Sequence, residues 1–96
     1  IVIVTIPDFG VTSDGSKYGK GRNISDGITE FNNIIKKHAS LRNLPCVDIF
    51  PISKRMENEA DLVAADNIHG SAKMYSLWEE LIYPEVERLL REEVRK

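Results

Sequence analysis

The chain has 96 residues, with 13 basic and 15 acidic side chains and a formal net charge of −2. This length allows one small domain at most, and the near balance of charge argues against a protein that binds nucleic acid. The single cysteine excludes an internal disulfide, and no apolar run reaches the roughly 20 residues that a membrane-spanning helix needs.

The first half of the sequence is typical of a strand–helix–strand unit. Residues 1–6 are apolar and mostly β-branched, which predicts a strand covered on both faces. A helix is expected from Asn23 or Ser25 to about Asn43, because its apolar residues recur at spacings of three and four. Residues 46–50 predict a second strand, parallel to the first. The apolar stripe of the helix is expected to comprise Ile28, Phe31, Ile35 and Ala39.

The segment between the first strand and the helix, residues 8–22, contains four glycines and little periodicity. We expect it to be a mobile loop that either lines the substrate site or closes over a substrate. A plain solvent-exposed loop is the alternative. The segment does not match a phosphate-binding loop, because no Gly-Lys pair is followed by Ser or Thr at the required spacing.

The second half begins with a polar connection over residues 53–65, with a short helix expected around residues 57–63. A long helix is predicted from Ser71 to Glu93, and Pro84 should bend or break it. Two strands and two helices do not cover both faces of a parallel sheet, so further strands are expected from a missing part of the chain or from a partner. The apolar stripe of the last helix is expected to comprise Met74, Trp78, Leu81 or Ile82, Val86, Leu89 or Leu90, and Val94.

The most informative pair is Asp66 and His69, which lies between the polar connection and the last helix. A histidine that acts as a general base needs a partner to hold its Nδ1–H, and a carboxylate three residues away on one turn provides it. Two alternatives remain open at this point. Asp66 can simply shape a turn, or the pair can bind a metal, for which His38 is the only further histidine.

The residues from Ala64 to Trp78 resemble the C-terminal block of SGNH hydrolases, also called GDSL-type lipases and esterases. That block reads roughly Asp-Gly-x-His-Pro-Ser, followed by a helix with an aromatic residue. Further similar segments precede it in the family's order, namely residues 4–8, 28–32 and 47–50. Gly70 stands where many members have Pro, and Asn67 stands where many have Gly.

This resemblance implies that residues 1–96 are the C-terminal fragment of a single SGNH hydrolase domain. The fold implied is the C-terminal βαβα portion of a flavodoxin-like three-layer α/β/α sandwich with a parallel sheet. The implied activity is hydrolysis of carboxylic esters by a Ser-His-Asp triad without metal or cofactor, in which Asp66 is the orienting acid and His69 the general base.

The family's nucleophilic serine and its oxyanion-hole donors have no matching positions in these residues. The fragment alone is therefore expected to be inactive, with a small ester as substrate once the N-terminal portion or a second copy completes the site. The competing interpretation is a non-catalytic flavodoxin-like or receiver-like α/β binding module.

Overall fold

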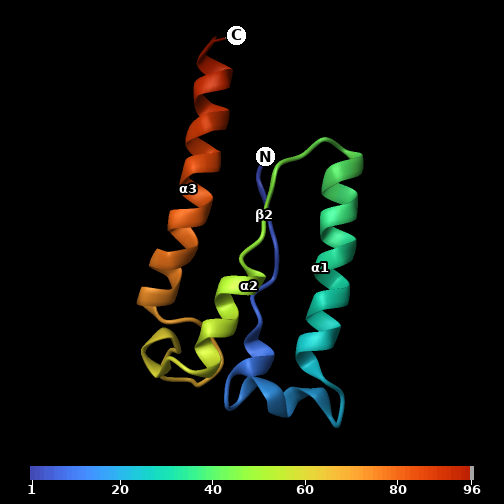
Figure 1. Ribbon diagram of the computed structural model, residues 1–96, viewed down its shortest axis with the longest axis vertical. Helices are drawn as coiled ribbons and strands as arrows, with labels where there is room; N and C mark the ends of the chain where they lie inside the picture. Colours follow the sequence, from blue (N-terminus) through green and yellow to red (C-terminus); the bar gives the residue numbers. More distant parts are fainter. Residues whose placement is uncertain (96) are drawn as a thin grey trace.

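The computed structural model describes residues 1–95, with side chains as far as Glu92 (Figure 1). Within this range two short strands alternate with helices that differ greatly in length. The elements are β1 (Ile3–Val4), α1 (Ile24–Leu41), β2 (Cys46–Val47), α2 (Phe50–Ser53) and α3 (Ala72–Arg95). Short 3-10 helices join them, namely η1 (Phe9–Val11), η2 (Gly15–Gly19), η3 (Lys54–Glu57) and η4 (Ala60–Leu62).

The strands β1 and β2 pair in parallel, with Ile3 opposite Cys46 and Val4 opposite Val47. The predicted parallel pairing of the two strands is therefore confirmed. The predicted flavodoxin-like three-layer α/β/α sandwich is wrong for this chain, because the described structure is 63% helical and its sheet has only two strands of two residues each. Two strands of two residues each do not make up the extended central sheet of such a sandwich.

Both strands are shorter than predicted because side chains take over the backbone hydrogen bonds of the sheet. The Asn32 side chain accepts from the N–H of Ile6 at 2.8 Å and donates to its carbonyl at 2.9 Å, which closes off the end of β1. Beyond β2, the Thr5 hydroxyl accepts from the N–H of Ile49, and Asp48 accepts from the N–H of Phe50. The chain then turns into α2, and Phe50 is helical rather than extended.

The predicted helix after the glycine-rich loop is confirmed as α1. Asn23 caps it by accepting from the N–H of Asp26 at 3.0 Å, and Asn43 follows its end with a left-handed φ of 54°. The predicted apolar stripe is partly wrong. Phe31 is 64% exposed, whereas the polar Asn32 is buried because its amide satisfies the backbone of Ile6.

The helices α1 and α3 both contact β2, and in Figure 1 they lie on opposite sides of the strand pair. Pro84 lies inside α3 without ending the helix, and the C-terminal turns of α3 extend beyond the strands. The side chain of Val94 lies outside the described residues. No helix among residues 1–95 combines the length and the apolarity needed to cross a bilayer. The buried apolar core comprises Ile49, Met56, Leu62, Met74 and Trp78.

Candidate active site

Asp66 and His69 lie on one tight turn between η4 and α3. The Val63–Gly70 antiparallel bridge closes the turn at its base, where the N–H of Ala64 donates to the carbonyl of His69 at 2.8 Å. Asn67 occupies the left-handed region at a φ of 62°, a conformation that asparagine tolerates better than most residues. The structure therefore brings the two predicted site residues together on one local turn of the chain.

The Asp66 carboxylate uses both of its oxygens within this turn. Oδ1 accepts from the backbone N–H groups of Ile68 and His69, each at 3.0 Å, while Oδ2 contacts the His69 Nδ1 directly. When Nδ1 carries the ring proton and donates a hydrogen bond to Oδ2, the lone pair of Nε2 is free to accept a proton. The hydrogen bond from the His69 ring, and then those from the two backbone N–H groups, lower the pKa of Asp66 from 3.8 to about 2.

The pair lies at the surface, with 70% of the His69 side chain and 47% of the Asp66 side chain exposed. His69 also borders an apolar groove of about 1090 Å³. Among the described residues that line this groove, Glu79 is the only aspartate, glutamate, lysine or arginine. Its walls include Phe9, Tyr18, Tyr75, Trp78, Ile82 and Tyr83. An exposed imidazole at the edge of an apolar groove can meet a substrate that has an apolar group.

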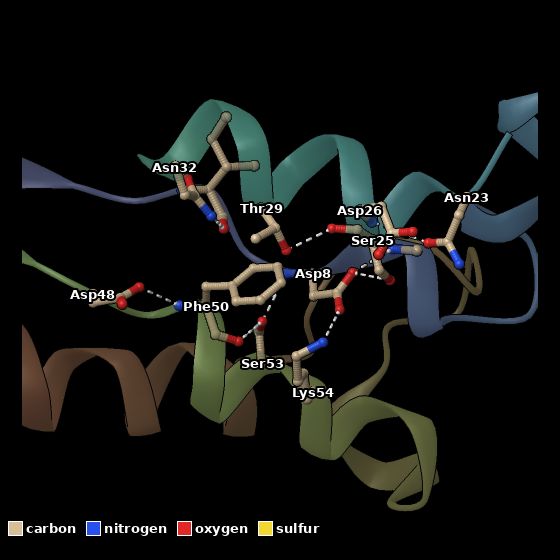
Figure 2. Close-up of polar contacts among 12 residues, drawn as sticks. Asp8, Asn23, Ser25, Asp26, Thr29, Asn32, Asp48, Phe50, Ser53 and Lys54 are labelled. Carbon is tan, nitrogen blue, oxygen red and sulfur yellow. Dashed lines mark hydrogen bonds and ion pairs between the residues drawn. The ribbon is translucent and has the colours of Figure 1, made fainter. Parts of the chain in front are cut away.

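The glycine-rich segment contains η1 and η2 instead of forming a featureless loop. Its first residue, Asp8, is fully buried, and Figure 2 shows its carboxylate between Ser25 of α1 and Lys54 of η3. The Ser25 hydroxyl donates to Asp8 Oδ1 at 2.7 Å, and Lys54 Nζ donates to Oδ2 at 2.9 Å. The backbone N–H of Asp8 donates to the Ser53 hydroxyl at 2.7 Å. These polar contacts attach the start of the segment to α1, α2 and η3.

In the part of the chain that the structure describes, no hydroxyl or thiol group hydrogen-bonds to the His69 imidazole. Ser71, the nearest serine in sequence, is occupied as the cap of α3. Its hydroxyl donates to the carbonyl of Asp61 at 2.7 Å and accepts from the N–H of Met74 at 3.3 Å. Ser25 bonds to Asp8 instead. The described residues thus bring together a carboxylate and an imidazole without a hydroxyl or thiol group aligned with them.

Two contributors to the site were not identified from the sequence. The first is Asp14, whose backbone N–H donates to the carbonyl of Asn67 at 3.2 Å and so joins the glycine-rich segment to the turn. The second is Tyr18, which lines the groove together with His69. Neither has a sequence signal, because both act through contacts between segments about 50 residues apart.

Among the side chains described, those of residues 1–92, no group of three or more His, Cys, Asp and Glu side chains lies together where it could hold a metal ion. His38 lies exposed on α1, where it contacts Arg42. In comparisons with known proteins, no family model, no curated protein and no solved structure matches this chain.

Proposed function

We propose that this chain supplies the general base and the orienting acid of an SGNH-type serine hydrolase that cleaves carboxylic esters. The observation that carries this proposal is the contact of Asp66 Oδ2 with His69 Nδ1 on a turn whose backbone is held by Asp66 Oδ1. One carboxylate thus orients the imidazole and fixes the turn that presents it. The resemblance of residues 64–78 to the family's C-terminal block supports the same roles.

The proposed reaction uses His69 twice. Nε2 first accepts the proton of a serine hydroxyl while that oxygen forms a bond to the ester carbonyl carbon. The resulting imidazolium, stabilised by Asp66, then gives the proton to the departing alkoxide as the ester C–O bond breaks. A water molecule repeats the sequence on the acyl-enzyme, which releases the carboxylic acid and regenerates the serine.

In this proposal the serine and the oxyanion-hole donors come from outside these 96 residues. Their proposed source is a further portion of the same domain. Each donor that stabilises the tetrahedral oxyanion lowers the activation barrier by about 3–4 kcal/mol. Residues 1–96 alone should therefore show no ester hydrolysis above background. The proposed substrate is a small ester, and the apolar groove beside His69 suits an apolar acyl or alcohol group.

The test is hydrolysis of p-nitrophenyl acetate by the intact protein that contains this chain. His69→Ala removes the base and should lower kcat by about 10⁴-fold or more. Asp66→Asn retains an oxygen for the backbone N–H groups but offers an amide N–H to Nδ1. This favours the tautomer in which Nε2 carries the proton, so we expect a loss of up to about 10⁴-fold.

His38→Ala and Asp61→Asn are the matched controls, because both residues are exposed and their side chains contact Arg42 and Lys73 rather than Asp66 or His69. They should retain full activity. If folded His69→Ala protein keeps its kcat, His69 is not the base and the proposed hydrolase function is wrong.

A further inference from the structure

The turn that holds Asp66 and His69 has little packing of its own. Residues 65–67 and His69 are exposed, and of the residues between Ala64 and Gly70 only Ile68 is partly covered. The geometry of the turn therefore depends on backbone hydrogen bonds more than on burial. The Val63–Gly70 bridge supplies these at the base of the turn, where the N–H of Ser71 donates to the carbonyl of Leu62.

At the tip of the turn the support comes from a distant part of the chain. The N–H of Asp14, at the start of η2, donates to the carbonyl of Asn67 at 3.2 Å. Asn67 has the left-handed φ of 62°. Its carbonyl belongs to the peptide unit that continues into Ile68, whose N–H donates to Asp66 Oδ1. The hydrogen bond from the Asp14 N–H is thus made to the same peptide unit whose N–H donates to the Asp66 carboxylate.

The segment that carries Asp14 is itself firmly held. Thr12 is 3% exposed, and its hydroxyl donates to the carbonyl of Phe9 at 2.7 Å and accepts from the N–H of Gly15 at 3.0 Å. At Gly15 a Cβ atom would lie only 1.9 Å from the carbonyl oxygen of Phe9. This glycine therefore permits close backbone packing rather than motion. Buried Asp8 fixes the start of the segment to α1 and η3 (Figure 2).

We propose that residues 8–22 form a rigid strap that positions the Asp66–His69 turn, with the Asp14 N–H as the contact that transmits its support. Asp14 is thus a positioning residue that acts through its backbone. This inference rests on the proposed function. It replaces the expectation of a mobile lid by a fixed segment that supports the turn carrying His69. Loss of the contact should lower kcat, because the imidazole loses its orientation, and should leave KM nearly unchanged.

The experiment compares two substitutions at the same position in the intact protein. Asp14→Pro removes the N–H donor, whereas Asp14→Ala keeps it and removes the carboxylate, which pairs with Lys17 and also lies near the Asn67 side chain. Hydrogen–deuterium exchange of peptides covering residues 64–70 is the first readout, and the kcat and KM for p-nitrophenyl acetate are the second. In Asp14→Pro we expect exchange of this turn to rise about fivefold and kcat to fall by a similar factor. In Asp14→Ala the exchange of the turn should match that of the unmodified protein.

A second pair of substitutions, at Asn67, provides a test in case Asp14→Pro prevents the strap from folding. Asn67→Gly retains the left-handed conformation and should preserve kcat, whereas Asn67→Val opposes this conformation and should lower kcat with KM unchanged. Equal exchange and equal kcat in Asp14→Pro and Asp14→Ala, together with equal kcat in the Asn67 pair, would overturn the inference. An unmodified protein without esterase activity, in which Asp14→Pro still loosens residues 64–70, would refute the proposed hydrolase and support the strap.

Discussion

Gly70 offers a sharp test of how the site is packed against α3. A Cβ atom at this position would lie 2.9 Å from Met74 Cγ and 3.0 Å from Trp78 Cη2. Met74 is fully buried and Trp78, which also lines the groove, is 7% exposed, so a methyl group at Gly70 must displace one of these packed side chains. Overpacking of this kind costs about 1–3 kcal/mol. Because the Met74 side chain is flexible, we expect Gly70→Ala to destabilise the fold by about 1–2 kcal/mol.

Urea unfolding followed by tryptophan fluorescence measures this effect, since Trp78 is the only tryptophan in the sequence. With a slope of about 1–2 kcal/mol per M for a chain of this size, the midpoint should fall by about 1 M. Gly70→Pro brings in the same Cβ and should also destabilise, even though many members of the resembled family have proline there. The Val63–Gly70 bridge is made through the His69 carbonyl and the Ser71 N–H, so a lost N–H at Gly70 does not break it.

Gly27→Ala is the matched control. Gly27 lies inside α1, and a Cβ there would meet nothing within 4 Å. Replacing it by alanine should stabilise the protein by about 0.5–1 kcal/mol through helix propensity. The two glycines should thus respond in opposite directions to the same added methyl group. A Gly70→Ala variant as stable as the unmodified protein, measured beside a stabilised Gly27→Ala, would refute the packing that we describe around Gly70.

Three further outcomes follow from the same structure. Since the pKa of Asp66 is lowered from 3.8 to about 2, its contribution to stability is complete above about pH 4 and is lost as the pH falls towards 2; urea unfolding at several pH values should show this loss, and Asp66→Asn should remove it. Leu62→Ala, at a fully buried position, should cost about 2–5 kcal/mol in the same assay. Asn32→Ala leaves the N–H and the carbonyl of Ile6 without their partner and should cost about 1–3 kcal/mol, whereas Asn33→Ala, at an exposed neighbour, should change stability by less than about 0.5 kcal/mol.

The order of the main elements could be predicted from the sequence because it depends on local signals. The cap at Asn23 and the apolar repeat define α1, and the β-branched run defines the position of β1. The extent of the strands could not be predicted in this way. It depends on whether a neighbouring strand or a side chain satisfies each backbone group, and Thr5, Asn32 and Asp48 take that role here.

The glycines of the strap show a second limit of sequence analysis. A glycine can serve a positive φ, a close contact or plain flexibility, and the letter alone does not tell these apart. Gly21 has a φ of 88°, whereas Gly10 and Gly15 lie where a Cβ would collide with neighbouring atoms. The expectation of a mobile loop assigned all of them to flexibility. Contacts in the folded chain decide between the three roles, because Gly10 lies against Ser25 and Gly15 lies against Phe9. No sequence pattern marks either contact.

The same distinction between local signals and distant contacts applies to the candidate site. Asp66 and His69 could be predicted as a pair because three residues on one turn are enough to bring a carboxylate to an imidazole. A base that must reach a substrate has to stay exposed, and exposure deprives it of the packing that would hold it in place. Its orientation must then come from backbone bonds to a better anchored segment, and the Asp14–Asn67 bond provides one. The proposed chemistry thus rests on a short motif, while the contacts that hold the motif in place come from residues far away in the chain.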